Sequence, residues 1–185
     1  MKVEQTPLKD CYIIHDTVFA DERGYFFESF NQQKFQSLTG LDISFVQDNQ
    51  SKSSRGVLRG MHYQLGKHAQ AKLVRVLEGT VLDVVVDIRK ESPTFMQSFS
   101  IELTADNHKQ FFVPRGFAHG FVVLSQTATF FYKCDNFYNK EAEGGFIYND
   151  KIINIDWQIS EQELILSSKD VALPSFEEVK ATLIF

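Results

Sequence analysis

The chain has 185 residues, 43% of them hydrophobic, which is enough for a sizeable core in one domain or two small ones. Its formal net charge of −5 argues against general nucleic-acid binding, which needs a broad basic surface, and leaves open a local basic pocket for a small anion. The first residues lack the apolar stretch of a signal peptide and no apolar run approaches the ~20 residues of a membrane span, so we expect no membrane partner.

The first part of the chain predicts two short strands and one helix. Residues 12–14 and 25–30 have the composition of strands, with a polar turn at residues 21–24 between them. Residues 31–38 are expected to form a short helix, because Asn31 can serve as its N-cap and Gly40 stands just beyond its end.

The middle of the chain is rich in strand signals. Residues 73–77 and 81–88 are dominated by Val and Leu and are joined through a Glu-Gly pair, which is typical of a hairpin. The pattern continues in residues 99–103, 110–113, 120–124 and 128–134. Near the C-terminus, Ser160 and Glu163 have the spacing of a capping box, which predicts a helix near residues 161–166.

Many short strands with almost no helix between them indicate an antiparallel jelly-roll barrel or sandwich with short peripheral helices. The 18 Phe residues fit the wide interior of such a fold. Because no repeat, low-complexity tract or linker-like stretch divides the sequence, we expect one domain over residues 1–185.

The alternation in residues 81–88 is unusual. Asp83 shares one face of the predicted strand with Val81, Val85 and Asp87. Either this face is half exposed and carries ordinary surface aspartates, or Asp83 points inward to hold a cationic or imidazole partner.

The segment RGVLRGMHYQ at residues 55–64 combines two arginines and a histidine with apolar side chains in what looks like a strand. Arginine and histidine are costly to bury unless they are paired or functional, so the segment indicates a site that binds an anion and moves a proton; the alternative is a surface strand with solvated arginines. Strict alternation puts Arg59 and His62 on opposite faces. A bulge at Gly60 would bring both inward.

The segment PRGFAHG at residues 114–120 is similar to the second conserved stretch of the cupin superfamily, PxGxxH, which favours a cupin-type jelly roll. Metal-binding cupins supply two further histidines separated by one residue, whereas His62 and His68 are six positions apart. A metal site formed by His62, His119 and one carboxylate stays open, but the nearby lysine and arginines disfavour a cation.

A metal-free site fits the same residues. Moving a proton next to a carbonyl needs a base of near-neutral pKa such as His62, and a cation for the enolate oxygen such as Lys72. Inverting the carbon needs a proton donor on its other face, which Tyr132 can supply. Arg59 would bind a diphosphate through bidentate bonding. The plainer alternatives are that Lys72 lies at the rim and that Tyr132 is an ordinary buried, hydrogen-bonded tyrosine.

Six segments in order resemble the dTDP-4-dehydrorhamnose 3,5-epimerases, metal-free dTDP-sugar epimerases of the cupin superfamily. They are DERGYFFE (21–28), FVQDNQSKSSRGVLRGMHYQ (45–64), KLVRVLEGTVLDVVVDIRKESPTF (72–95), VPRGFAHGFVVLS (113–125), YKCDNFY (132–138) and LSSKDVALP (166–174). The departures are local: Tyr148 and Lys151 stand where the family commonly has tryptophan and proline, and Met96 where glycine is usual.

The resemblance implies a role for each catalytic side chain. His62 would be the general base, oriented by Asp170, which the residues alone would suggest is a surface side chain. Lys72 would hold the C4 enolate oxygen, and Tyr132 would return a proton from the other face. The substrate contacts implied are His119 near the sugar or its phosphate, Arg59 and Arg23 on the diphosphate, Tyr138 stacked on thymine, and Glu28, Gln47, Asn49, Glu143 and Lys169.

The implied reaction is epimerisation at C3 and C5 of dTDP-4-dehydro-6-deoxy-D-glucose to dTDP-4-dehydro-L-rhamnose through enolates, without cofactor or metal. A homodimer would share its active sites, so that some of these residues act in trans. The alternatives are a C3 or C5 single-site epimerase, a 3,4-ketoisomerase, a metal-binding cupin oxygenase and a non-catalytic sugar-binding cupin. Cys11 and Cys134 show no motif spacing and fit reduced thiols in a cytoplasmic protein.

Overall fold

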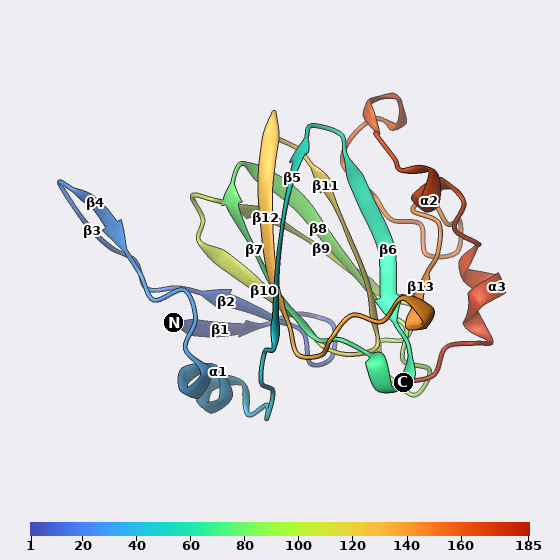
Figure 1. Cartoon of the computed structure of the whole chain (residues 1–185), viewed down its shortest axis with the longest axis horizontal. Helices are drawn as coiled ribbons and strands as arrows, with labels where there is room; N and C mark the ends of the chain where they lie inside the picture. Colours follow the sequence, from blue (N-terminus) through green and yellow to red (C-terminus); the bar gives the residue numbers. More distant parts are fainter.

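Two antiparallel sheets face each other in the computed structural model, which describes residues 1–185 (Figure 1). The larger sheet has the strand order β1 (Lys2–Gln5), β2 (Tyr12–His15), β10 (Lys109–Val113), β7 (Lys72–Glu78), β12 (Thr127–Cys134) and β5 (Gln47–Ser54). The smaller sheet has the order β13 (Glu143–Gly145), β6 (Leu58–Gln64), β11 (Phe117–Val123), β8 (Thr80–Asp87) and β9 (Ser98–Thr104). The predicted mainly β sandwich with short helices is confirmed.

The central core lies between the two sheets. Its largest side chains are Phe111 and Phe130 from the larger sheet and Phe117 and Phe121 from the smaller one, packed among Val and Ile residues of β7, β8 and β9. Fully burying one large apolar side chain is worth about 1.5–3 kcal/mol, so this layer holds the sheets together. Between the edges of the sheets the sandwich is open, and the cavity described below lies there.

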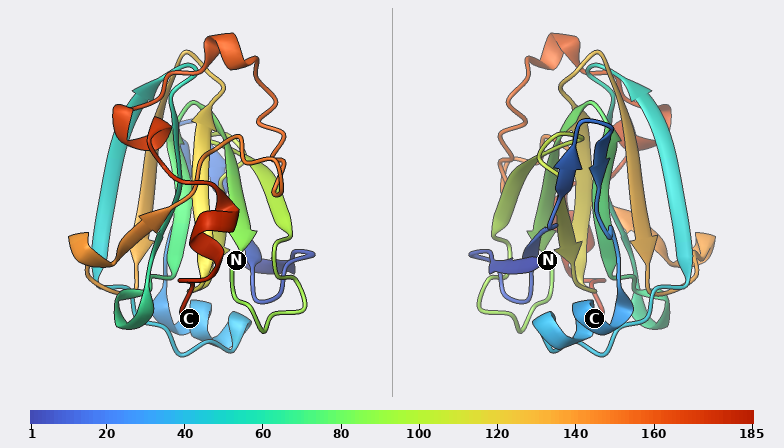
Figure 2. Two further views of the ribbon diagram at one scale, coloured as in Figure 1. Left: turned by 90° about the vertical axis from the view of Figure 1, so that its right-hand side faces the viewer. Right: turned by 90° about the vertical axis from the view of Figure 1, so that its left-hand side faces the viewer.

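The outer face of each sheet is also covered. The chain after β13 runs along the outside of the smaller sheet and contributes Phe146, Trp157 and Phe176 to a second apolar cluster (Figure 2). On the larger sheet, α1 (Gln32–Thr39) packs Phe35 against Phe112. The remaining helices are short: α2 (Ser168–Val171), α3 (Phe176–Lys180) and the 3₁₀ turns η1 (Gly66–His68), η2 (Lys140–Ala142) and η3 (Glu161–Glu163). No helix has the length and apolar composition needed to cross a membrane.

The prediction for α1 is confirmed at both ends. Asn31 caps the helix by accepting a hydrogen bond from the backbone N–H of Lys34, and Gly40 ends it with a φ of 72°. The helix predicted for residues 161–166 is wrong, because only the short turn η3 forms and Ser160 makes no side-chain cap. Its last part is extended instead, since Ile165 pairs with the chain beside Val57.

Two strand predictions also need correction. The Glu-Gly pair before β8 turns the chain from one sheet to the other, so β7 and β8 are not a hairpin. A turn signal specifies a reversal of the chain but not the partner of each strand. Residues 25–30 are a strand only in β4 (Gly24–Phe26), which pairs with β3 (Phe19–Asp21). Beyond it, Phe27 packs on His108 and has no strand partner.

The β3–β4 hairpin projects from the body of the molecule (Figure 1). It carries large apolar side chains that are mostly exposed, at 64% for Phe19, 63% for Tyr25 and 70% for Phe26. Three such rings on two three-residue strands cannot bury one another, so the hairpin has the composition of a surface that packs on another molecule.

Candidate active site

A distortion in β6 brings Arg59 and His62 to the same face of the smaller sheet. His62 pairs with His119 on β11 and Arg59 pairs with Phe121, so three residue steps on β6 oppose two steps on β11. Strict alternation is therefore wrong for this pair, and the bulge at Gly60 that would bring both side chains inward is present. Gly60 has a φ of 137°, and a Cβ on it would lie 2.6 Å from the Cα of Gly120, so the site depends on glycine at this crossing.

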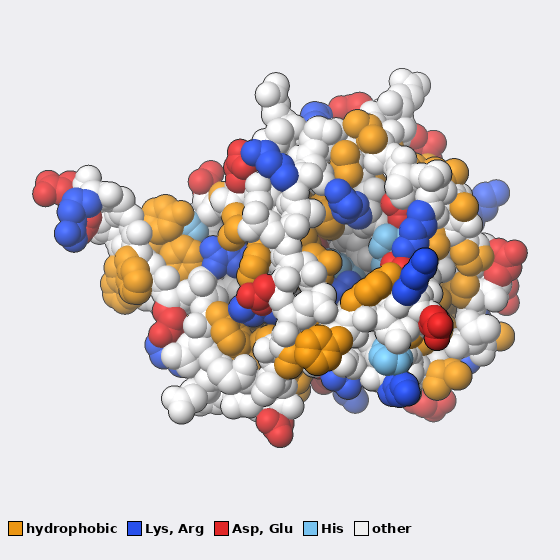
Figure 3. Space-filling view, viewed as in Figure 1, with side chains coloured by type: hydrophobic (Ala, Val, Ile, Leu, Met, Phe, Trp, Pro, Cys, Tyr) orange, Lys and Arg blue, Asp and Glu red, His pale blue; other side chains and the backbone are white.

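A cavity of about 650 Å³ opens in front of these side chains, between the two sheets. Figure 3 shows it as a hollow with histidine inside and Lys or Arg side chains around its mouth. An adjoining pocket of about 270 Å³ shares Asn49, His62, Lys72 and Tyr132 with it. These four side chains thus stand where the two pockets meet.

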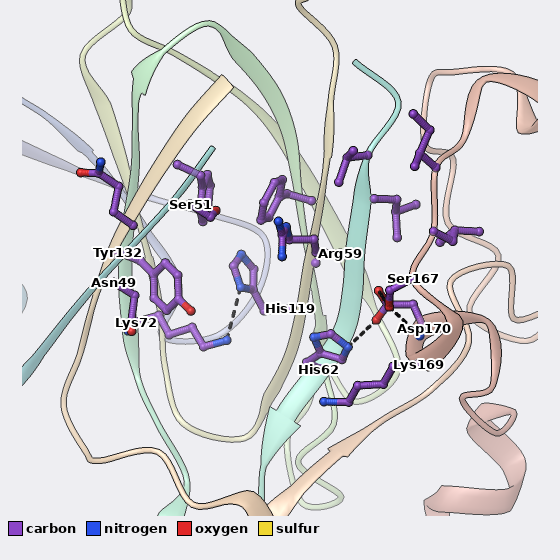
Figure 4. Close-up of a pocket in the computed structure, with 18 residues that line it drawn as sticks. Asn49, Ser51, Arg59, His62, Lys72, His119, Tyr132, Ser167, Lys169 and Asp170 are labelled. Carbon is purple, nitrogen blue, oxygen red and sulfur yellow. Dashed lines mark hydrogen bonds and ion pairs between the residues drawn. The ribbon is translucent and has the colours of Figure 1, made fainter. Parts of the chain in front are cut away.

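His62 and Asp170 form a hydrogen-bonded pair on one wall of the cavity (Figure 4). The Nε2 of His62 lies 2.7 Å from Oδ1 of Asp170, and the other carboxylate oxygen accepts a hydrogen bond from Ser167, the N-cap of α2. Burial lowers the pKa of His62 and the charge of Asp170 acts against that shift. Since Nε2 donates to Asp170, the lone pair of Nδ1 is left to act as a base.

A second histidine–aspartate pair lies deeper in the smaller sheet. The Nε2 of His119 is 2.9 Å from the carboxylate of Asp83, which is fully buried. The interpretation of Asp83 as an inward residue with an imidazole partner is therefore correct, and that of a half-exposed face is wrong. Its face is covered by the larger sheet, which single-strand alternation cannot reveal.

Lys72 reaches the cavity from β7 and ends 3.5 Å from Nδ1 of His119. The alternative position at the rim is wrong, since Lys72 lines both pockets. Burial lowers the pKa of its ammonium group. A partly desolvated lysine beside an open cavity can bind a developing negative charge strongly.

Tyr132 lies on β12, across the cavity from His62 (Figure 4). Its hydroxyl has no hydrogen-bond partner in residues 1–185, so the expectation of an ordinary paired tyrosine is not met. Burial raises the pKa of Tyr132, which keeps the phenol protonated at neutral pH. An unpaired phenol facing a cavity is suited to donating a proton to a ligand.

Arg59 is a cation without a carboxylate partner. Its guanidinium donates only to the hydroxyl of Ser53, at 3.2 and 3.4 Å. The neighbouring cation Lys169 pairs with Glu143 at 2.7 Å, and Glu143 also accepts a hydrogen bond from the hydroxyl of Tyr138. Arg59 is therefore free to bind an anion, whereas Lys169 would first exchange partners.

Gln47 and Asn49 are joined by a hydrogen bond of 3.1 Å along β5. Gln47 also accepts a hydrogen bond from the backbone N–H of Tyr138, and Asn49 donates to the thiol of Cys134. Both side chains line the smaller pocket.

Arg23 and Glu28 do not reach the cavity of their own chain. Arg23 pairs with Asp21 at the tip of the projecting hairpin, 2.6 Å away, and Glu28 pairs with Lys34 at the start of α1. Within one chain, the structure brings together every other predicted site residue around the two pockets.

Several lining residues were not predicted, above all Ser51 and Ser167. Alternation along residues 47–54 would have put Ser51 and Ser53 on the face of Asn49, but this polar strand has no apolar residues to reveal it. No three His, Cys, Asp or Glu side chains gather as a metal site would require. The metal site considered above needs His62 and His119 to share one carboxylate. In the structure they do not: His62 pairs with Asp170 and His119 pairs with Asp83.

Comparisons with known proteins identify the family. A family model described as dTDP-4-dehydrorhamnose 3,5-epimerase matches residues 5–178. The enzyme of that name from Salmonella typhimurium is 51% identical and covers 98% of this chain and 99% of its own. A crystal structure of the Elizabethkingia anophelis enzyme is 63% identical, with a TM-score of 0.93, and covers 96% of this chain and 97% of its own. A Legionella pneumophila dTDP-6-deoxy-D-glucose-3,5-epimerase in complex with dTDP-4-keto-L-rhamnose is 45% identical, with a TM-score of 0.94 and coverage of 99% and 96%. The chain therefore belongs to the dTDP-4-dehydrorhamnose 3,5-epimerase family.

Proposed function

We propose that the protein inverts C3 and C5 of dTDP-4-dehydro-6-deoxy-D-glucose and so forms dTDP-4-dehydro-L-rhamnose. The observation that carries the proposal is the position of His62 and Tyr132 on opposite walls of one cavity, with Lys72 between them (Figure 4). C3 and C5 both lie next to the C4 carbonyl, so one enolate oxygen serves both inversions.

The proton transfers follow from this arrangement. Nδ1 of His62 takes the proton from carbon, and the electrons of the broken C–H bond move onto the C4 oxygen as an enolate. The ammonium of Lys72 stabilises that oxygen. Tyr132 then donates its phenolic proton to the opposite face of the same carbon, which inverts the centre. Proton exchange with water returns His62 and Tyr132 to their starting forms.

Asp170 supports the base in two ways. It accepts the hydrogen of Nε2 and thereby fixes the tautomer of His62, and its charge stabilises the imidazolium formed when the proton is taken up. Burial alone would make this histidine a weak base.

The nucleotide part of the substrate would occupy the remaining space. Arg59 would bind the diphosphate, because it is the cation without a carboxylate partner, and Lys169 would join it. Tyr138, whose ring is half exposed, would stack on thymine. Glu143, Gln47, Asn49 and His119 would complete the contacts to nucleotide and sugar.

The proposal includes a homodimer in which Arg23 and Glu28 act in the partner's site. It is supported by the exposed rings of the β3–β4 hairpin and by the distance of both residues from their own cavity. It also includes a cytoplasmic location, which the two free cysteines support. Neither cofactor nor metal is part of it, since the reaction has no net redox change and a side chain is available for each proton transfer and for the enolate oxygen. Stoichiometric iron or zinc in purified protein would contradict this.

The decisive experiment is incorporation of solvent deuterium into the substrate, followed by NMR. We expect exchange at C3 and C5 and formation of the L-rhamno product. Exchange at one carbon would reduce the protein to a single-site epimerase, and exchange at neither would refute the proposal.

A further inference from the structure

Asp83 is a buried carboxylate with a single partner. It is 0% exposed, and its two oxygens lie 3.1 and 2.9 Å from Nε2 of His119. Its neighbours on the same face of β8 include Val81 and Val85 of the central core. No Lys or Arg pairs with it. Burying a carboxylate among valines is costly unless its charge acts on another charged group.

Lys72 is the charged group within reach. It has no carboxylate within ion-pair distance, and its nearest polar contact is Nδ1 of His119, 3.5 Å from Nζ. An ammonium in a cavity wall needs a counter-charge to remain protonated. His119 stands between the two, with Asp83 on one ring nitrogen and Lys72 on the other. Figure 4 shows the side of His119 that faces Lys72.

The position of the hydrogen on the imidazole of His119 decides how Asp83 acts on Lys72. Because Nε2 faces a carboxylate, it carries the hydrogen, and Nδ1 of His119 then presents a lone pair to Lys72. A neutral imidazole of this tautomer accepts a hydrogen bond from an ammonium. It therefore links the negative charge of Asp83 to the positive charge of Lys72 without adding a charge of its own.

We propose that Asp83 is a positioning residue that acts through His119 to keep Lys72 in its ammonium form. This inference rests on the proposed function, because the ammonium is the form that stabilises the enolate oxygen. Asp83 does not line the cavity. Its effect is on the range of pH over which Lys72 can work.

The charged and titratable groups that face Lys72 come from five neighbouring strands: Tyr132 and Cys134 on β12, His119 on β11, Asp83 on β8, His62 on β6 and Glu143 on β13. Burial lowers the pKa of Lys72, and charges on Cys134, Asp83 and Glu143 oppose that shift. Since the pKa of Cys134 is raised to about 11, its thiol is neutral at physiological pH and offers little help. Without Asp83, Lys72 would lose its proton at a lower pH.

The test is the Asp83→Asn variant. Asparagine keeps the shape and still accepts the hydrogen bond from Nε2, and only the charge is removed. The rate of deuterium exchange at low substrate concentration is measured from roughly pH 6 to 10, which spans the titration of a lysine with a lowered pKa. We expect the alkaline midpoint to fall by about one pH unit, with a rate within a few-fold of the unaltered protein at the acidic end. An unchanged midpoint in a folded variant would overturn the proposal.

The Asp87→Asn variant is the matched control. Asp87 is a second fully buried carboxylate on β8, but it is bonded to Arg89, Ser92 and Thr94, away from the cavity. Its loss is expected to lower the unfolding temperature and leave the alkaline midpoint in place. An equal shift of the midpoint in both variants would overturn the specific role of Asp83.

A second measurement needs no change at Asp83 and no substrate. Nitrogen-15 NMR of histidine-labelled protein, assigned with a His119→Gln variant, reads the protonation of both ring nitrogens. We expect the hydrogen of His119 on Nε2 and none on Nδ1, the nitrogen that faces Lys72; a hydrogen on Nδ1 would refute the proposal. If the unaltered protein exchanges no deuterium, the proposed function fails while this measurement still reports on the Asp83–His119–Lys72 chain.

Discussion

His62 and His119 lie directly opposite each other on β6 and β11, and each directs its Nε2 at a buried aspartate. The aspartates come from different parts of the chain. Asp170 belongs to α2 near the C-terminus, and Asp83 belongs to the central strand β8. Two imidazoles of the same tautomer thus meet one cavity, one next to open space and the other next to Lys72. The first is suited to take a proton and the second to support a cation.

Replacing Asp170 by asparagine tests the base. The pKa of His62 is lowered mainly by burial, and Asp170 acts against that shift. In Asp170→Asn the opposing charge is lost, so the pKa of His62 falls further and the acidic limb of the pH–rate profile moves to lower pH. The maximal rate should fall by about 100-fold, because a weaker base is left in a less fixed orientation. A pH series of deuterium exchange checks both. An acidic limb that moves to higher pH would contradict the assignment of His62.

Tyr132→Phe separates proton removal from proton return. The variant keeps the ring and removes only the hydroxyl, which has no partner in the protein and whose loss should therefore cost little stability. Deuterium exchange through His62 should persist, while net inversion falls by about 100-fold or more. Both are read from one NMR time course. An equal loss of exchange and inversion would show that the two residues do not divide the work in this way.

Lys72→Ala removes the cation beside the enolate oxygen. Loss of such a donor should raise the barrier by at least ~3 kcal/mol, which is more than 100-fold in rate. Lys133→Ala is the matched control, because Lys133 lies on the next strand but pairs with Asp48 on the outer side. The exchange rates of the two variants at neutral pH give the comparison. A near-normal rate for Lys72→Ala would show that another group holds the oxygen.

Gly60→Ala tests the backbone that brings Arg59 and His62 to one face. Gly60 has a φ of 137°, which is strained for any other residue, and an added Cβ would lie 2.6 Å from the Cα of Gly120. We expect a loss of about 3 kcal/mol in the free energy of unfolding. Gly40→Ala, at a φ of 72° with open space around it, should cost about 1 kcal/mol. Denaturant unfolding of both variants gives the comparison, and equal losses would mean that the close approach to Gly120 is not limiting.

Much of the fold was predictable because local signals specified it. Alternation and turn residues indicated most strands of the two sheets, although not β1, β5 or β13, and Asn31 and Gly40 marked the ends of α1. What failed was non-local. The Glu-Gly pair before β8 signalled a turn but could not tell which sheet the next strand joins. Likewise the capping pattern at Ser160 was overridden because Ile165 pairs with a distant strand.

The site residues also fall into those that local sequence signals indicated and those that depend on contacts between distant parts of the chain. Strict alternation put Arg59 and His62 on opposite faces, and Gly60 marked the place where a bulge would bring both inward. Asp170 was predictable only from the family resemblance, since nothing in a short helix near the C-terminus points to a histidine 108 positions away. The geometry of the Asp83–His119–Lys72 chain needed three strands from two sheets, and no spacing along the sequence encodes that.

Mixing two inactive variants tests whether the active site is shared between subunits. If Arg23 acts in the partner's site, a dimer of one Arg23→Ala chain and one His62→Ala chain has one intact site, since the unaltered Arg23 reaches the unaltered His62. After unfolding and refolding of an equal mixture, half of the dimers are mixed, so about a quarter of the normal exchange rate should return. A mixture of Lys72→Ala and His62→Ala chains is the control. Because both residues line the cavity of the same chain, each site of a mixed dimer still lacks one of them. If neither mixture regains activity, Arg23 does not act in the partner's site. If both mixtures regain activity, residues of the cavity wall as well as Arg23 are shared between the subunits.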